Sequence, residues 1–148
     1  MIEVYSPYLA AIVAGWVLGH GVKYLLDVLK GRKIDPLREL FISGGMPSSH
    51  TTAAVSLWTV ILLKDGWTSG LFGLATLFAL IVAYDAVKVR RSVGEHGRAI
   101  TEVIAKTKVK VKAPYTAPGH RPIEVVVGAL FGLVVGGLVY ILTDSWTW

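Results

Sequence analysis

Residues 122–142 read PIEVVVGALFGLVVGGLVYIL, an apolar stretch in which Glu124 is the single charged residue. About 20 such residues cross the hydrocarbon core of a bilayer as a helix. Three further apolar runs precede this one along the chain, at about 7–29, 47–63 and 70–87. The sequence therefore predicts an all-α fold, a polytopic helical bundle of about four transmembrane helices that forms one domain over residues 1–148.

The composition is typical of a membrane protein and excludes several other classes. Of the 148 residues, 53% are hydrophobic and only 17% are charged, whereas soluble domains have about 25% charged residues. The chain has no cysteine, which excludes a disulfide framework, a thiol nucleophile and a cysteine-ligated metal. The net charge of +5 is confined to short stretches between apolar runs, so we expect no nucleic-acid partner.

Basic residues lie on one side of the predicted bundle. The loops at about 30–46 and 88–121 hold every lysine and arginine except Lys23 and Lys64. The positive-inside rule therefore places both loops in the cytoplasm. The second loop is expected to begin as a helix through 98–104 and to continue as a solvated basic segment near anionic headgroups. The short connection at 64–69 predicts an antiparallel hairpin of the second and third runs.

The first run contains ionisable residues, which are costly inside a membrane and mark functional sites by default. His20, Lys23 and Asp27 are spaced i, i+3 and i+7 and share one helix face. Two interpretations stay open. Lys23 and Asp27 either form a pair that reaches the interface from the helix end, or they face the bundle interior and serve a function there.

The second run opens with the residues Ser43-Gly44-Gly45-Met46-Pro47-Ser48-Ser49-His50. Proline suits the first turn of a helix, and Gly45 lets the backbone approach a ligand. Ser48 and Ser49 add hydroxyl groups beside the amide groups of a helix start, which favour an anion. His50 follows as an acid or base. The motif indicates a phosphate-binding helix start; the alternative is a serine and histidine cap at the interface.

The third run ends in a group of opposite charges. Asp85 lies at the end of the run, and Arg90 and Arg91 follow it. Guanidinium groups bind phosphate oxygens in a bidentate manner, so this group is a candidate phosphate clamp with Asp85 in support. The alternative is a basic flank in which Asp85 pairs with one arginine.

The fourth run opens with a histidine and a carboxylate on one face. His120 and Glu124 are spaced i, i+4, and a carboxylate beside an imidazole orients it and raises its basicity. Gly128, Gly132 and Gly136 continue the same stripe, and small residues at this spacing let another helix pack closely. The face is therefore expected to point at protein.

The charge pattern brings these groups to one face of the membrane. Two histidines, a carboxylate and several cations are what metal-independent phosphoryl transfer requires: one imidazole attacks phosphorus and the other protonates the leaving oxygen. The embedded carboxylates Asp85 and Glu124 make Mg²⁺ the weaker interpretation. We expect no metal and no cofactor.

Taken together, these motifs resemble the divergent branch of the type-2 phosphatidic acid phosphatase family, which belongs to the superfamily of acid phosphatases and vanadium haloperoxidases. The resemblance covers about residues 23–128. It implies that His50 is the general acid and that His120 is the nucleophile that becomes phosphohistidine, with Glu124 where the superfamily has aspartate.

Several positions depart from the superfamily pattern. Pro114 stands where the third motif has arginine, and Arg90 or Arg91 is the candidate to supply that charge. Lys23 stands in for the lysine of the first motif, with Arg38 as a poorer candidate. The typical membrane enzyme of the superfamily has six spans. Either the missing spans are dispensable here, or a homodimer completes the bundle.

The sequence thus predicts a membrane-embedded lipid phosphatase that hydrolyses a phosphomonoester or diphosphate at the cytoplasmic interface. Its partners would be membrane lipids and a lipid phosphate substrate, such as a phosphatidate-like lipid or a polyprenyl diphosphate. Two alternatives stay open: a carrier or flippase that binds lipid phosphate without cleaving it, and a phosphotransferase that passes the phosphoryl group to an alcohol.

Overall fold

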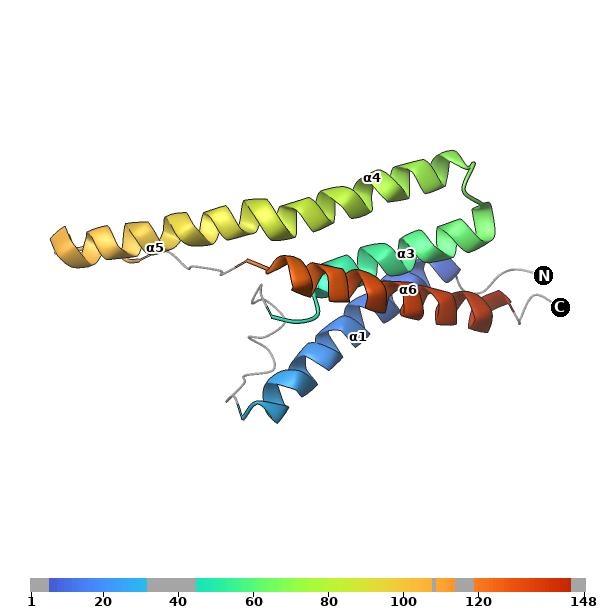
Figure 1. Ribbon diagram of the computed structural model, residues 1–148, viewed down its shortest axis with the longest axis horizontal. Coiled ribbons are helices and arrows are strands. Elements are labelled where there is room, and N and C mark those ends of the chain that lie inside the picture. Colours follow the sequence, from blue (N-terminus) through green and yellow to red (C-terminus); the bar gives the residue numbers. More distant parts are fainter. Residues whose placement is uncertain (1–5, 32–44, 108, 114–118, 145–148) are drawn as a thin grey trace.

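The computed structural model describes residues 6–31, 45–107, 109–113 and 119–144, and the regular structure within these residues is helical, without strands. Most of the first basic loop, Arg38 included, and Pro114 lie outside them. Figure 1 shows the helices α1 (Pro7–Leu29), α3 (Ser49–Asp65), α4 (Gly70–Tyr84), α5 (Arg90–Thr107) and α6 (Pro122–Asp144), and between α4 and α5 lies the π-helical turn η1 (Asp85–Val89). The predicted all-α bundle is confirmed.

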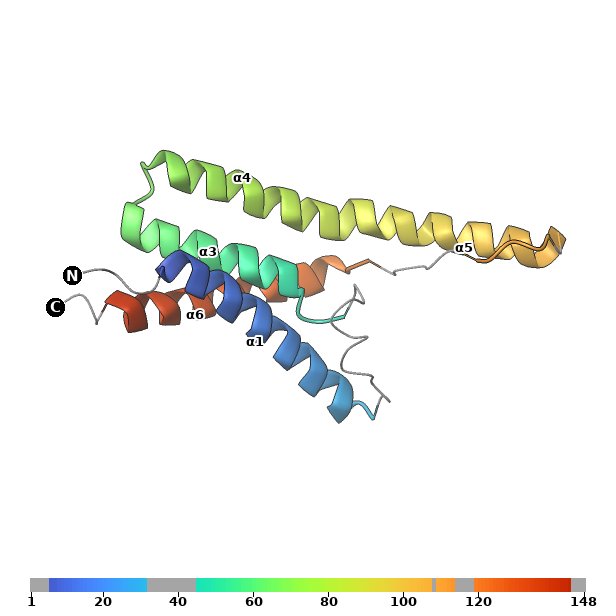
Figure 2. The ribbon, with the colours of Figure 1, turned by 180° about the vertical axis from the view of Figure 1, so that it is seen from behind.

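Within the described residues, three stretches are long and apolar enough to cross a membrane: Pro7–Leu29, Gly70–Thr107 and Pro122–Thr143. The shorter helix α3 lies between them and packs against α1, α4 and α6 (Figure 2). The side chains that α3 buries are mostly hydroxyl-bearing or small: Ser49, Thr51, Thr52, Ala54, Ser56, Thr59, Val60 and Ile61. Among the helices α1, α3, α4 and α6, the innermost one, α3, is therefore the least apolar.

Glycines let α6 approach the backbone of α3. A Cβ atom added at Gly128, Gly132 or Gly136 would lie 2.5 to 2.8 Å from a carbonyl oxygen of α3 or of Ser48, the residue before it. The hydroxyl groups of Thr52 and Ser56 donate to the carbonyl oxygens of Gly128 and Gly132, at 3.1 and 3.2 Å. In membrane proteins, close backbone contact at small residues and hydrogen bonds between helices hold the helices together, where a soluble protein relies on a hydrophobic core. The prediction that this stripe faces another helix is confirmed.

Helix α1 also approaches α3 closely through glycines. A Cβ atom at Gly15 would lie 2.8 Å from the Cα atom of Ala53, and one at Gly19 would lie 3.0 Å from the Cα atom of Ser49. Small residues therefore set the distance from α3 to both α1 and α6, so that polar side chains near the beginning of α3 lie within reach of both helices.

The hairpin between α3 and α4 agrees with the sequence prediction. Gly66, with a φ of 78°, ends α3, and the hydroxyl oxygen of Ser69 accepts a hydrogen bond from the amide of Phe72 to start α4. Across the two helices, Trp58 Nε1 donates to Thr76 Oγ1 at 2.8 Å. These contacts hold α4 antiparallel to α3.

Helix α4 continues through η1 into α5 as one helical stretch of 38 residues, Gly70–Thr107. At 1.5 Å per residue this stretch is about 57 Å long, whereas a hydrocarbon core is about 30 Å thick. Helix α5 accordingly extends away from the other helices (Figures 1 and 2). The second basic loop thus begins as a helix that includes the predicted residues 98–104, and 109–113 follow without regular structure.

A matched pair of variants tests the packing of α6 on α3. Gly132→Ala would place a methyl group 2.7 Å from the carbonyl oxygen of Thr52, whereas Gly137→Ala, on the same helix, meets nothing within 4 Å. We expect Gly132→Ala to lower stability by about 1–3 kcal/mol through overpacking and Gly137→Ala to be neutral or stabilising. Thermal unfolding in detergent measures both; equal midpoints would contradict this packing.

Candidate active site

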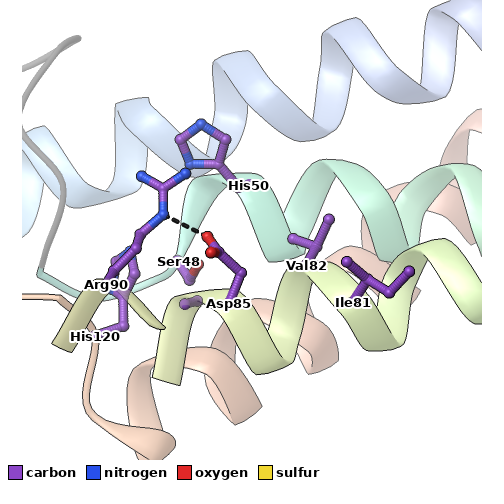
Figure 3. Close-up of a pocket in the computed structure, with 8 residues that line it drawn as sticks. Ser48, His50, Ile81, Val82, Asp85, Arg90 and His120 are labelled. Carbon is purple, nitrogen blue, oxygen red and sulfur yellow. Dashed lines mark hydrogen bonds and ion pairs between the residues drawn. The ribbon is translucent and has the colours of Figure 1, made fainter. Parts of the chain in front are cut away.

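The beginnings of α3 and α6 and the end of α4 meet at one end of the bundle. A cavity of about 240 Å³ lies there (Figure 3), and its lining residues are Ser48, His50, Ile81, Val82, Asp85, Ala86, Arg90 and His120. Three separate parts of the chain thus contribute to one cavity. The structure brings both candidate histidines to it, together with an acid and an arginine.

His120 is placed by its backbone before α6 begins. The preceding residue, Gly119, has a φ of 68°, a conformation that side chains other than glycine rarely adopt. A Cβ atom there would lie 2.6 Å from the backbone nitrogen of Arg91. The His120 amide donates to the carbonyl oxygen of Ala86 at 3.2 Å. The chain that carries His120 therefore rests directly on η1 and the first residues of α5.

The imidazole of His120 is held by the first turn of α6. Its Nδ1 lies 3.0 Å from Glu124 Oε2, which also accepts from the amide of Arg121 at 3.1 Å. A carboxylate only accepts hydrogen bonds, so Nδ1 carries a hydrogen, and in the neutral imidazole the lone pair is on Nε2. His120 is only 6% exposed, and the hydrogen bond at Nδ1 orients the ring and leaves Nε2 as the nitrogen that could act on a substrate.

Glu124 also connects α6 to the beginning of α3. Its carbonyl oxygen accepts from the amide of Ser48 at 3.1 Å, and the hydroxyl oxygens of Ser48 and Thr51 are 3.0 Å apart. Ser48 is the N-cap of α3, so Pro47 precedes the helix and does not form its first turn as expected. His50 lies in that first turn and lines the cavity. One glutamate therefore positions both histidine-bearing segments.

Asp85 and Arg90 form an ion pair because the helix widens between them. The Arg90 amide donates to the carbonyl oxygen of Asp85 in a π-helical turn, and Arg90 Nε lies 2.7 Å from Asp85 Oδ2. In a regular α-helix, residues five apart point about 140° away from each other; the i to i+5 turn brings them onto one side. Figure 3 shows the guanidinium group directed towards His50, with Asp85 beside it.

Four predicted phosphate-binding residues do not line this cavity. Arg91 forms an exposed ion pair with Glu95, at 3.1 Å between Nε and Oε1; as the neighbour of Arg90 it is rotated about 100° around the helix axis. The other three, Ser49, Lys23 and Gly45, lie on the side of α1.

On that side, Ser49 Oγ lies 3.3 Å from His20 Nε2. The Lys23 side chain passes beside Gly45, since a Cβ atom added there would lie 2.9 Å from Lys23 Cε. Lys23 and Asp27 are 4% and 8% exposed. These two side chains are therefore buried and do not extend into solvent from the end of α1.

The sequence interpretation did not identify the apolar wall of the cavity. Ile81 and Val82 lie one turn before Asp85, and Ala86 follows it. The sequence did contain a signal for this wall: Ile81 and Val82 lie four and three residues before Asp85, and residues at this spacing share a helix face. In the described part of the chain, no three His, Asp or Glu side chains are grouped as metal ligands.

The fold and the cavity define a helical integral membrane protein with two histidines at a polar site near one end of its bundle. The chain belongs to the Divergent PAP2 family, whose sequence profile matches residues 4–135. It is similar to the "Uncharacterized membrane protein YuiD" of Bacillus subtilis (strain 168), with 33% identity over 142 residues, which are 86% of this chain and 87% of the relative. No solved structure matches the chain.

Proposed function

We propose that this protein is a phosphatase that hydrolyses a phosphomonoester or diphosphate of a membrane lipid through a phosphohistidine intermediate. The observation that carries the proposal is the His120–Glu124 pair, at 3.0 Å, whose imidazole shares a cavity with His50 and Arg90. Family membership supports phosphatase-related chemistry. The three side chains supply the nucleophile, the acid and the cation that phosphoryl transfer needs.

In the first step, Nε2 of His120 attacks phosphorus. The bond from phosphorus to the leaving oxygen breaks, and protonated His50 gives its proton to that oxygen. In the second step, water attacks the phosphohistidine, His50 takes the proton of the water, and the nitrogen–phosphorus bond breaks to release phosphate. Glu124 holds the hydrogen on Nδ1, so the charge that develops on the imidazole of His120 is stabilised in both steps.

Arg90 is the cation that would bind the phosphoryl oxygens. Its pairing with Asp85 uses Nε–H, one of the five N–H donors of a guanidinium group. Asp85 therefore orients Arg90 in this proposal and does not take part in proton transfer. A positive charge that is already in place stabilises the negative charge that develops on the phosphoryl oxygens in the transition state.

The apolar wall supports a lipid as substrate. Ile81 lines the cavity and is also 56% exposed, and Leu77 and Leu74, one and two turns earlier, are 56% and 64% exposed. These residues form a continuous apolar stripe along α4 that leads away from the polar end of the cavity. A phosphatidate-like lipid or a polyprenyl diphosphate would place its phosphate near Arg90 and its chain along this stripe. The basic loops favour a cytoplasmic location for this end.

Phosphate release by the purified protein in detergent tests the proposed function. Phosphatidate, a polyprenyl diphosphate and a soluble aryl phosphate are compared, each with and without EDTA. We expect release that resists EDTA and that is fastest with one of the lipids. Bound lipid phosphate without release would contradict hydrolysis and favour a carrier or flippase. Transfer to an added alcohol in place of water would favour a phosphotransferase.

Gly119→Ala tests the contact that places the nucleophile. The added methyl group would lie 2.6 Å from the backbone nitrogen of Arg91, so His120 must shift. A misplacement of about 1 Å can cost about 100-fold in rate, and we expect a loss of this size. Gly66→Ala is the matched control, since Gly66 also has a positive φ of 78° but nothing within 4 Å of its Cβ position. Equal activities of the two variants would contradict the placement.

A further inference from the structure

His20 makes two contacts that fix its imidazole and its tautomer. Nδ1 lies 2.9 Å from the carbonyl oxygen of Trp16, and the ring packs on the Trp16 indole with 4.5 Å between centroids. A carbonyl oxygen only accepts, so the hydrogen lies on Nδ1. In the neutral ring Nε2 then has the lone pair and accepts from the Ser49 hydroxyl group at 3.3 Å. Nε2 is thus directed at the hydroxyl group of Ser49, the first residue of α3.

The first turn of α3 is held from two sides. On the side of α6, the amide of Ser48 donates to the carbonyl oxygen of Glu124. On the side of α1, Ser49 is buried to 6% exposure and bonds to His20. The glycine next to His20, Gly19, lets α1 approach closely, because a Cβ atom there would lie 3.0 Å from Ser49 Cα. The residue that follows Ser49 is His50.

We propose that His20 is a positioning residue for His50. By accepting the Ser49 hydrogen bond, it fixes the first turn of α3 against α1 and so sets where the His50 imidazole lies in the cavity. Ser49 therefore acts through α1 and not as a ligand of phosphate. The inference rests on the proposed function for its kinetic consequence, whereas the hydrogen bond and the placement of His50 stand independently of it.

Three variants separate a positioning role from simple packing. His20→Leu removes the acceptor, whereas His20→Gln keeps an oxygen near the place of Nε2. His96→Leu, at an exposed histidine of α5, is the control. We expect His20→Leu to lower kcat about tenfold, because the acid is displaced by a fraction of 1 Å, with KM within about twofold of the wild-type value. We expect His20→Gln to regain most of this loss.

A double-mutant cycle with Ser49→Ala tests the connection directly. If His20 acts through Ser49, then Ser49→Ala lowers kcat as much as His20→Leu does, and the double variant is no slower than either. Additive losses would overturn the proposal, as would a failure of glutamine to restore kcat. A large rise in KM for Ser49→Ala would show instead that Ser49 binds phosphate.

Nitrogen-15 NMR of the histidine rings keeps the test independent of phosphatase activity. We expect Ser49→Ala to shift the Nε2 signal of His20, and His20→Leu to shift the ring signals of His50, while His96 stays unchanged. Unmoved His20 or His50 signals would overturn the positioning role even in an active enzyme. If these NMR shifts are seen but the protein releases no phosphate, the proposed function is overturned and the positioning role of His20 is not.

Discussion

Replacing His120 by alanine is expected to abolish phosphate release while the helical bundle stays folded. The imidazole lies in the cavity at 6% exposure, with its Nδ1 held by Glu124, and among the described residues it is the one imidazole of that cavity with a hydrogen bond to a carboxylate. Loss of a covalent nucleophile commonly costs several orders of magnitude. We expect a fall of at least about 1,000-fold in kcat.

The control for this variant is His96→Ala, since His96 is exposed on α5, outside the cavity. It should release phosphate at the wild-type rate. Circular dichroism and elution in detergent verify that both variants are folded. Full phosphate release by folded His120→Ala would contradict the mechanism, because no phosphohistidine could then form at this position.

Replacing His50 by alanine is expected to slow hydrolysis in a way that depends on the leaving group. A general acid contributes about 100- to 10,000-fold, and its contribution is largest when the leaving oxygen is strongly basic. We therefore expect a loss in this range for a lipid phosphomonoester, whose leaving group is an alkoxide. The leaving group of an aryl phosphate such as p-nitrophenyl phosphate is a phenolate, which departs without protonation. The rate of the first step with this substrate should therefore fall far less.

Rapid-quench kinetics of the aryl phosphate separates the two steps of this variant. His50→Ala should still form the phosphoenzyme but should hydrolyse it slowly, because the base that activates water is missing. A burst of nitrophenol followed by slow turnover is the expected result. Equal losses for both substrates, without a burst, would contradict the assignment of His50 as the acid and base.

Much of the fold could be predicted from the sequence because bilayer-length apolar runs and small-residue stripes are local patterns. The glycines of α6 were correctly predicted to face a helix, and they contact α3. The i, i+4 spacing of His120 and Glu124 correctly predicted that the two side chains would meet: His120 lies just before α6, and Glu124 in the first turn of that helix bonds back to it. The hairpin of α3 and α4 followed from the shortness of its connection.

The rest depended on rotation about helix axes, which residue spacing alone does not give. The π-helical turn η1 changes the phase of the helix between Asp85 and Arg90, so the pair forms across five residues and Arg90 rather than Arg91 lines the cavity. Ser48 and Ser49 are adjacent, yet one lines the cavity and the other bonds to His20. Which neighbour of α3 each residue faces is decided by tertiary packing.

The most direct test of the account is to trap the phosphoenzyme. The wild-type protein is mixed with a phosphorus-32-labelled substrate, quenched in alkali, in which phosphohistidine survives, and mapped by peptide mass spectrometry. We predict labelled phosphate on the peptide that contains His120, and none in His120→Ala. Turnover of the substrate with no label on the protein, or with the label on another residue, would contradict the proposed mechanism.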